Sequence, residues 1–140
     1  MELTANVAQS VATNQNVLFT DTAVRGNSSM IHREGSGIVM LRGLTCGQCR
    51  ARFKVYFNGN VAVPDGGEAG QISVAIALEG EPLTSTIMTV TPAAVNNYFN
   101  VSSEVYIDVP TGSCATVSIE NTSTQTISVS NANLIVERVA

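Results

Sequence analysis

Apolar and polar residues alternate along most of the chain. The clearest run is 50–57, in which Ala51, Phe53, Val55 and Phe57 are separated by arginine, lysine or tyrosine. A period of two places the two sets on opposite faces of an extended segment, so this run predicts a half-buried β-strand. Further strands are predicted at 17–19, 37–41, 72–78, 105–109, 115–119, 126–129 and 134–139.

Turn-forming residues separate these runs. They occur at 58–60 (Asn-Gly-Asn), 64–67 (Pro-Asp-Gly-Gly), 79–82 (Glu-Gly-Glu-Pro), 110–112 (Pro-Thr-Gly) and 121–123 (Asn-Thr-Ser). Glycine and asparagine tolerate positive φ, and proline fixes φ, which suits tight turns. Eight to ten short strands with no helical stretch between them predict an all-β sandwich or barrel, and 140 residues suffice for one such domain.

The first fifteen residues do not follow the alternation. Leu3, Val7 and Val11 recur every four residues, with alanines nearby, which allows a short helix or an extended arm. Either would bury little by itself. We therefore expect residues 1–15 to form a partner-binding arm that docks on a neighbouring molecule, and residues 16–140 to form the folded domain.

Composition favours a protein that packs against copies of itself. Hydrophobic residues make up 44% of the chain and charged residues only 13%, about half the usual share. The only local run of positive charge is Arg50, Arg52 and Lys54, which fits the solvent face of one strand better than a groove for nucleic acid. No apolar stretch reaches the roughly 20 residues of a membrane span, and no signal peptide is recognisable. We expect no nucleic-acid or membrane partner and synthesis in a cytoplasm.

The chain carries one motif with chemical potential, Cys46-Gly47-Gln48-Cys49. Such a motif can be a redox pair, half of a zinc site, or a turn that holds two thiols. A four-ligand zinc site would have to use Cys46, Cys49, Cys114 and His32, four scattered residues, and a thioredoxin-type pair needs a helix that an all-β chain lacks. The favoured interpretation is a turn or an adventitious disulfide, without metal or cofactor.

Signs of an active site are missing. His32 is the sole histidine and has neither a nucleophile nor a carboxylate motif beside it in the sequence. The acidic residues of the predicted loops follow no calcium-binding pattern. We expect a protein that is not an enzyme.

The order of motifs resembles the C1q/tumour-necrosis-factor-like jelly-roll family. Residues 16–20 resemble its opening strand, 35–43 its glycine-flanked second segment (with Ile38 in place of an aromatic residue), and 53–57 the strand that follows. Residues 105–119 resemble its long hairpin and 132–136 its closing strand, with Ala132 in place of an aromatic residue. The resemblance implies an all-β jelly-roll β-sandwich that assembles as a homotrimer through one sheet face. The residues then expected at the interface are Tyr98, Phe99, Tyr106, Ile135 and Val139.

A narrower likeness concerns the whole chain. Segments 31–37 and 90–96 are similar to those of small uncharacterised proteins encoded in prophages of Gram-positive gut bacteria. This implies a virion protein assembled in the bacterial cytoplasm, with the major capsid protein or another virion protein as its partner. The leading hypothesis is a trimeric capsid-decorating or auxiliary protein that stabilises the shell. The alternative is a trimeric receptor- or glycan-binding tip domain of a phage fibre or bacterial surface adhesin, which the absence of tryptophan disfavours for glycans.

Overall fold

The alternating pattern corresponds to twelve strands in the computed structural model, which describes residues 1–140. The strands are β1 (Glu2–Ala5), β2 (Gln9–Val11), β3 (Asp21–Val24), β4 (Met30–His32), β5 (Val39–Arg42), β6 (Arg50–Ala62), β7 (Ile72–Leu78), β8 (Glu81–Pro82), β9 (Met88–Val90), β10 (Phe99–Pro110), β11 (Cys114–Asn121) and β12 (Ile127–Arg138). The one helical segment, the 3-10 turn η1 (Thr84–Thr86), is far too short to cross a membrane.

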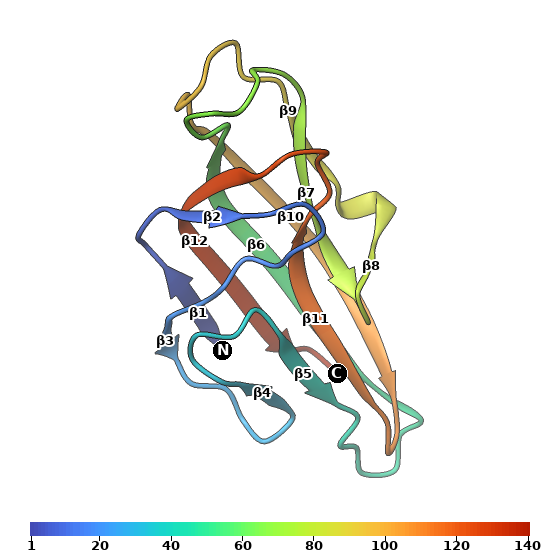
Figure 1. Cartoon of the computed structure of the whole chain (residues 1–140). Coiled ribbons are helices and arrows are strands. Elements are labelled where there is room, and N and C mark those ends of the chain that lie inside the picture. The colour runs from blue at the N-terminus through green and yellow to red at the C-terminus, as the bar shows by residue number, and fades with distance from the viewer.

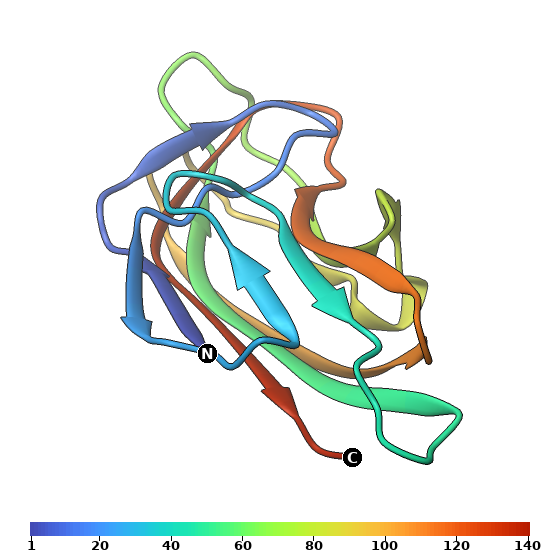
Figure 2. The same cartoon turned by 90° about the horizontal axis from the view of Figure 1, so that it is seen from below.

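The strands form two six-stranded antiparallel sheets that face each other (Figures 1 and 2). Sheet A has the order β10-β6-β12-β1-β3, and β2 pairs with one end of β12. Sheet B has the order β4-β5-β11-β7-β8, and β9 also pairs with β7. Apart from the consecutive pairs β4-β5 and β7-β8, neighbouring strands along the two sheet orders are not consecutive in sequence, as in a jelly roll, and the predicted all-β sandwich is confirmed.

The core lies between the two sheets and follows from the period-two pattern. In β6, Ala51, Phe53, Val55 and Phe57 have no exposed surface, as the alternation predicts. Together with residues from every other main strand they belong to one cluster of 28 buried apolar residues. At roughly 25 cal/mol per Å² of apolar area, burial on this scale is the main stabilising contribution to the fold.

Strand β6 continues through the predicted turn at 58–60, and that prediction is wrong. Asn58 pairs with Ser102 of β10 on one side and with Asn133 of β12 on the other. Gly59 faces inward, where the Phe57 ring leaves no room, since an added Cβ would lie 2.9 Å from its Cζ atom. The glycine therefore permits close packing inside a long strand, and pairing on both sides overrides the local turn preference.

Residues 1–15, predicted as an arm outside the jelly roll, instead contribute two strands to sheet A. Strand β1 lies between β12 and β3, and β2 pairs with β12. Leu3 and Val11 are buried in the core, whereas Val7, in the connection between the two strands, is 82% exposed. The i, i+4 spacing was misleading because Leu3 and Ala5 form the buried side of one short strand and Val11 belongs to the next.

Candidate functional site

The most distinctive surface is the outer face of sheet A, which we define as the side of β6, β10 and β12 turned away from sheet B. Near its centre, Tyr56 lies in register between Glu104 of β10 and Ile135 of β12. The next residue of β6 that faces the same way, Lys54, lies opposite Tyr106 of β10. Tyr106 is 63% exposed, more than either of the other two exposed aromatic residues. A large aromatic side chain thus projects from a flat sheet surface.

A hollow of about 310 Å³ lies beside this tyrosine on the same face. It is lined by Lys54, Tyr56, Glu104, Ile135 and Glu137. Its lining combines one aromatic and one aliphatic side chain with three charged ones. Protein interfaces combine apolar and polar side chains in this way.

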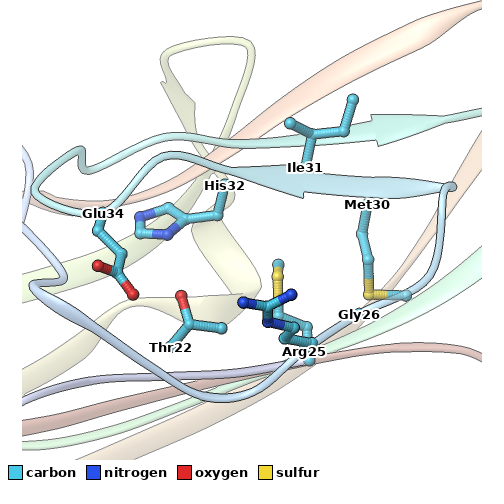
Figure 3. A pocket seen from close by; sticks show the side chains of 8 residues that line it. Thr22, Arg25, Gly26, Met30, Ile31, His32 and Glu34 are labelled. Atoms are coloured by element: carbon cyan, nitrogen blue, oxygen red, sulfur yellow. The ribbon is translucent and has the colours of Figure 1, made fainter.

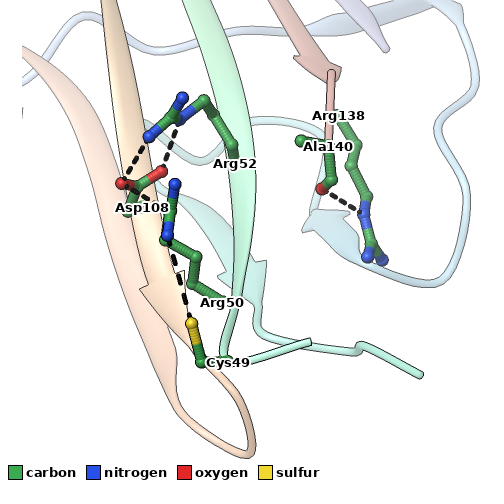
Figure 4. Close-up of polar contacts among 6 residues, drawn as sticks. All are labelled: Cys49, Arg50, Arg52, Asp108, Arg138 and Ala140. Atoms are coloured by element: carbon green, nitrogen blue, oxygen red, sulfur yellow. Dashed lines mark hydrogen bonds and ion pairs between the residues drawn. The ribbon is translucent and has the colours of Figure 1, made fainter. Parts of the chain in front are cut away.

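Ion pairs neutralise much of the charge at one end of this face. Asp108 lies between two arginines, with its Oδ1 atom 2.8 Å from Arg52 Nε and its Oδ2 atom 3.0 Å from Arg50 Nε (Figure 4). The hydrogen bond from Arg52 lowers the pKa of the Asp108 carboxyl. Lys54 Nζ lies 3.2 Å from Glu104 Oε2, and this contact raises the pKa of the lysine. Exposed pairs of this kind add little stability, but they let charged side chains enter an interface already paired.

Asparagines form a second cluster at the other end of the face. Asn100 Nδ2 donates to Asn58 Oδ1 at 2.7 Å and to Asn60 Oδ1 at 3.1 Å, and Asn60 Nδ2 donates to Asn131 Oδ1 at 3.4 Å. Sequence reasoning missed this cluster because its members come from three strands, and no local pattern brings them together. It gives the face an uncharged polar region beside the apolar one.

The five residues predicted at a subunit interface fall in two places. Tyr106, Ile135 and Val139 occupy outward positions on the outer face of sheet A, around the Lys54 end of β6. Tyr98 and Phe99 lie at the opposite end of the sandwich, where β10 begins. The Tyr98 hydroxyl is 2.7 Å from Ser128 Oγ, and Phe99 follows the inward alternation of β10. The structure therefore does not bring all five into one patch.

The three cysteines are exposed and unpaired, and all lie at one end of sheet B. Cys46 and Cys49 follow the end of β5, and Cys114 pairs with the last residue of that strand. His32, in contrast, pairs with Val39 at the beginning of β5. The structure contains no group of three or more His, Cys, Asp or Glu side chains placed to hold a metal ion, so the four residues considered for zinc do not converge.

Comparison with known proteins addresses the fold. No family model and no curated protein matches the chain. Among solved structures, the globular domain of zebrafish complement 1qA protein superposes with a TM-score of 0.62 at 13% identity, covering 96% of this chain and 93% of that one. Murine APRIL superposes with a TM-score of 0.58 at 11% identity, covering 95% of each chain.

The fold is a C1q/TNF-like jelly roll. The fold class predicted from the order of motifs is confirmed over almost the whole chain. Identities of 11–13% show the fold alone, and the likeness to prophage proteins stays a prediction.

Proposed function

We propose that this chain is a non-enzymatic assembly and binding module that forms a homotrimer through the outer face of sheet A. The observation that carries the proposal is the combination of an exposed Tyr106 with a hollow on the same face that Tyr56 and Ile135 help to line. In a rotational assembly each copy presents both features to its neighbours, so the tyrosine of one copy can fill the hollow of the next.

The size of the surface supports this arrangement. A standard interface takes about 800 Å² from each partner, so two contacts per copy would cover about 1,600 Å². The chain has 6989 Å² of accessible surface, and the three longest strands, β6, β10 and β12, lie side by side in sheet A. Burying Tyr106 between copies would remove the most exposed aromatic side chain from water, as expected of an interface anchor.

The biological role we propose is that of a virion protein, a capsid-decorating or auxiliary module whose partner is the major capsid protein or another virion protein. This part depends on the likeness of segments 31–37 and 90–96 to prophage proteins. A cementing protein needs self-association and partner contacts but no active site. Cryo-electron microscopy of the phage particle tests it, because density for three jelly rolls on the shell is expected and their absence from the particle would end the virion assignment.

The second candidate, a ligand-binding tip domain, is favoured by a polar hollow at the open edge of the sandwich between β3 and β4. The capsid-decorating role and the ligand-binding role both require the trimer. They differ in whether the exposed sheet edges contact another virion protein or a ligand.

Assembly itself is tested by a charge placed at the predicted anchor. Tyr106→Glu should convert the trimer into single chains, because its carboxylate would have to be buried in a hollow that Glu104 and Glu137 already line. Ile87→Glu is the matched control, since Ile87 is 42% exposed and follows η1 beside sheet B. Light scattering coupled to size exclusion gives the mass of each variant. If Tyr106→Glu stays trimeric, the proposed face is not the interface.

A further inference from the structure

The open edge of the sandwich contains a hollow of about 480 Å³, a volume within the range of small-molecule sites. It lies between β3, the edge strand of sheet A, and β4, the edge strand of sheet B. Figure 3 shows Thr22, Arg25, His32 and Glu34 directed into the same space. The lining residues are Met1, Thr22, Arg25, Gly26, Met30, Ile31, His32 and Glu34.

The hollow holds one cation and one anion that have no partners. Arg25 and Glu34 take part in none of the three ion pairs of the chain, which all lie on the outer face of sheet A. Both side chains are exposed, so solvent alone compensates their charges. A guanidinium can only donate hydrogen bonds and a carboxylate can only accept them. The hollow therefore offers a donor for an anionic group and an acceptor for a cationic one.

His32 supplies a second acceptor. Its Nε2 atom lies 2.9 Å from the Ser36 carbonyl oxygen. A carbonyl only accepts, so Nε2 carries a proton, and in the tautomer protonated only there Nδ1 is an acceptor. That Nδ1 atom is buried and has no hydrogen-bond partner. An unsatisfied buried polar atom is rare in folded proteins and is explained here if a bound molecule brings a donor.

The remaining wall is apolar and aliphatic. Met30 is buried, and Gly26 lies so close to it that an added Cβ would be 2.5 Å from Met30 Cγ. Together with Met1, Met30 forms a thioether wall that adapts to unbranched or branched alkyl groups. The side chain of Ile31, the residue between Met30 and His32 in β4, points to the opposite side of the strand (Figure 3). No aromatic residue lines the hollow, so it has no platform on which a sugar ring could stack.

We propose that this hollow binds a small zwitterion, an α-amino acid with an apolar side chain. The carboxylate of the ligand would pair with the Arg25 guanidinium, and its ammonium would donate to the Glu34 carboxylate and to His32 Nδ1 after a small side-chain movement. The alkyl group would lie against Met1 and Met30. This site lies away from the outer face of sheet A and goes beyond the assembly function.

The test is titration of the full chain with L-leucine. Binding is monitored by calorimetry and by the NMR shifts of the backbone amides of residues 22–34. Isocaproate, which lacks the ammonium, and isoamylamine, which lacks the carboxylate, should each bind about tenfold or more weakly, because one charge-assisted contact is lost. Arg25→Gln and Glu34→Gln should each weaken leucine binding by a similar factor.

Arg33→Gln is the matched control, because Arg33 is exposed, adjacent in sequence and absent from the lining of the hollow. It should bind leucine as the unaltered chain does. Three results would overturn the proposal: no response to leucine at millimolar concentration, equal binding by Arg25→Gln, or binding of glucuronate in preference to leucine. These results come from binding measurements, whereas the trimer is tested by molecular mass. Failure of the ligand proposal is therefore distinguishable from failure of the trimer proposal.

Discussion

The integration of the first strand into sheet A makes a sharp prediction for Leu3→Ala. Leu3 has no exposed surface and lies in register between Leu134 of β12 and Thr22 of β3. Truncating a buried leucine removes its transfer free energy and leaves a cavity, which costs about 2–5 kcal/mol. Against a total stability of about 5–15 kcal/mol, this is a large loss. At about 4 °C per kcal/mol for a domain of this size, we expect Tm to fall by about 10 °C or more.

The assay is urea unfolding followed by circular dichroism, with all variants at one chain concentration because assembly makes stability concentration-dependent. Val7→Ala is the matched control, since its side chain is 82% exposed and its loss should change the free energy of unfolding by no more than about 0.5 kcal/mol. If Leu3→Ala unfolds at the same urea concentration as Val7→Ala, residues 1–15 are an arm after all and the description of sheet A is refuted.

Three further predictions concern other parts of the fold. Thr86→Val should lower the free energy of unfolding by about 1–3 kcal/mol in urea titrations, because the buried Thr86 hydroxyl accepts from the Ile76 amide at 3.0 Å and donates to the Leu83 carbonyl at 2.7 Å; unchanged stability would show that the contact is unimportant. Burial, together with the nearby Glu81 carboxylate, raises the pKa of Glu120. Its ionisation therefore opposes folding at every pH above the raised pKa, so Glu120→Gln should be more stable than the parent at pH 7, and the difference should shrink as the pH falls through that pKa. The exposed cysteines should all react with a thiol reagent in the folded protein, so a count below three per chain would indicate a disulfide or a covered thiol.

Local patterns predicted the fold class because burial alternates along the clearest strands of the sandwich. The run 50–57 became the first part of β6 with its apolar residues buried as expected. The turns at 79–82 and 110–112 are also present, with Glu79 and Gly80 at φ values of 53° and 81° and Gly112 at 79°. At these positions the local conformational preference and the global fold agree, so a sequence pattern suffices.

Features that depend on distant pairing were not predictable. Asn58-Gly59-Asn60 has strong turn preference, but β10 and β12 extend it from both sides. The predicted runs 126–129 and 134–139 are parts of one strand, β12, which contains a register shift between Ser130 and Asn133. The hollow between β3 and β4 brings together two edge strands of different sheets. Nothing in a single stretch of sequence signals such a meeting.

The measurement that tests the central claim most directly is sedimentation equilibrium of the unaltered chain over a wide concentration range. One chain has a mass of 14.7 kDa, so burial of the outer face of sheet A between three copies predicts a species of about 44 kDa, three times that value. A single species of 14.7 kDa that persists at the highest concentration would contradict the account, because the exposed tyrosine and its neighbouring hollow would then have no partner.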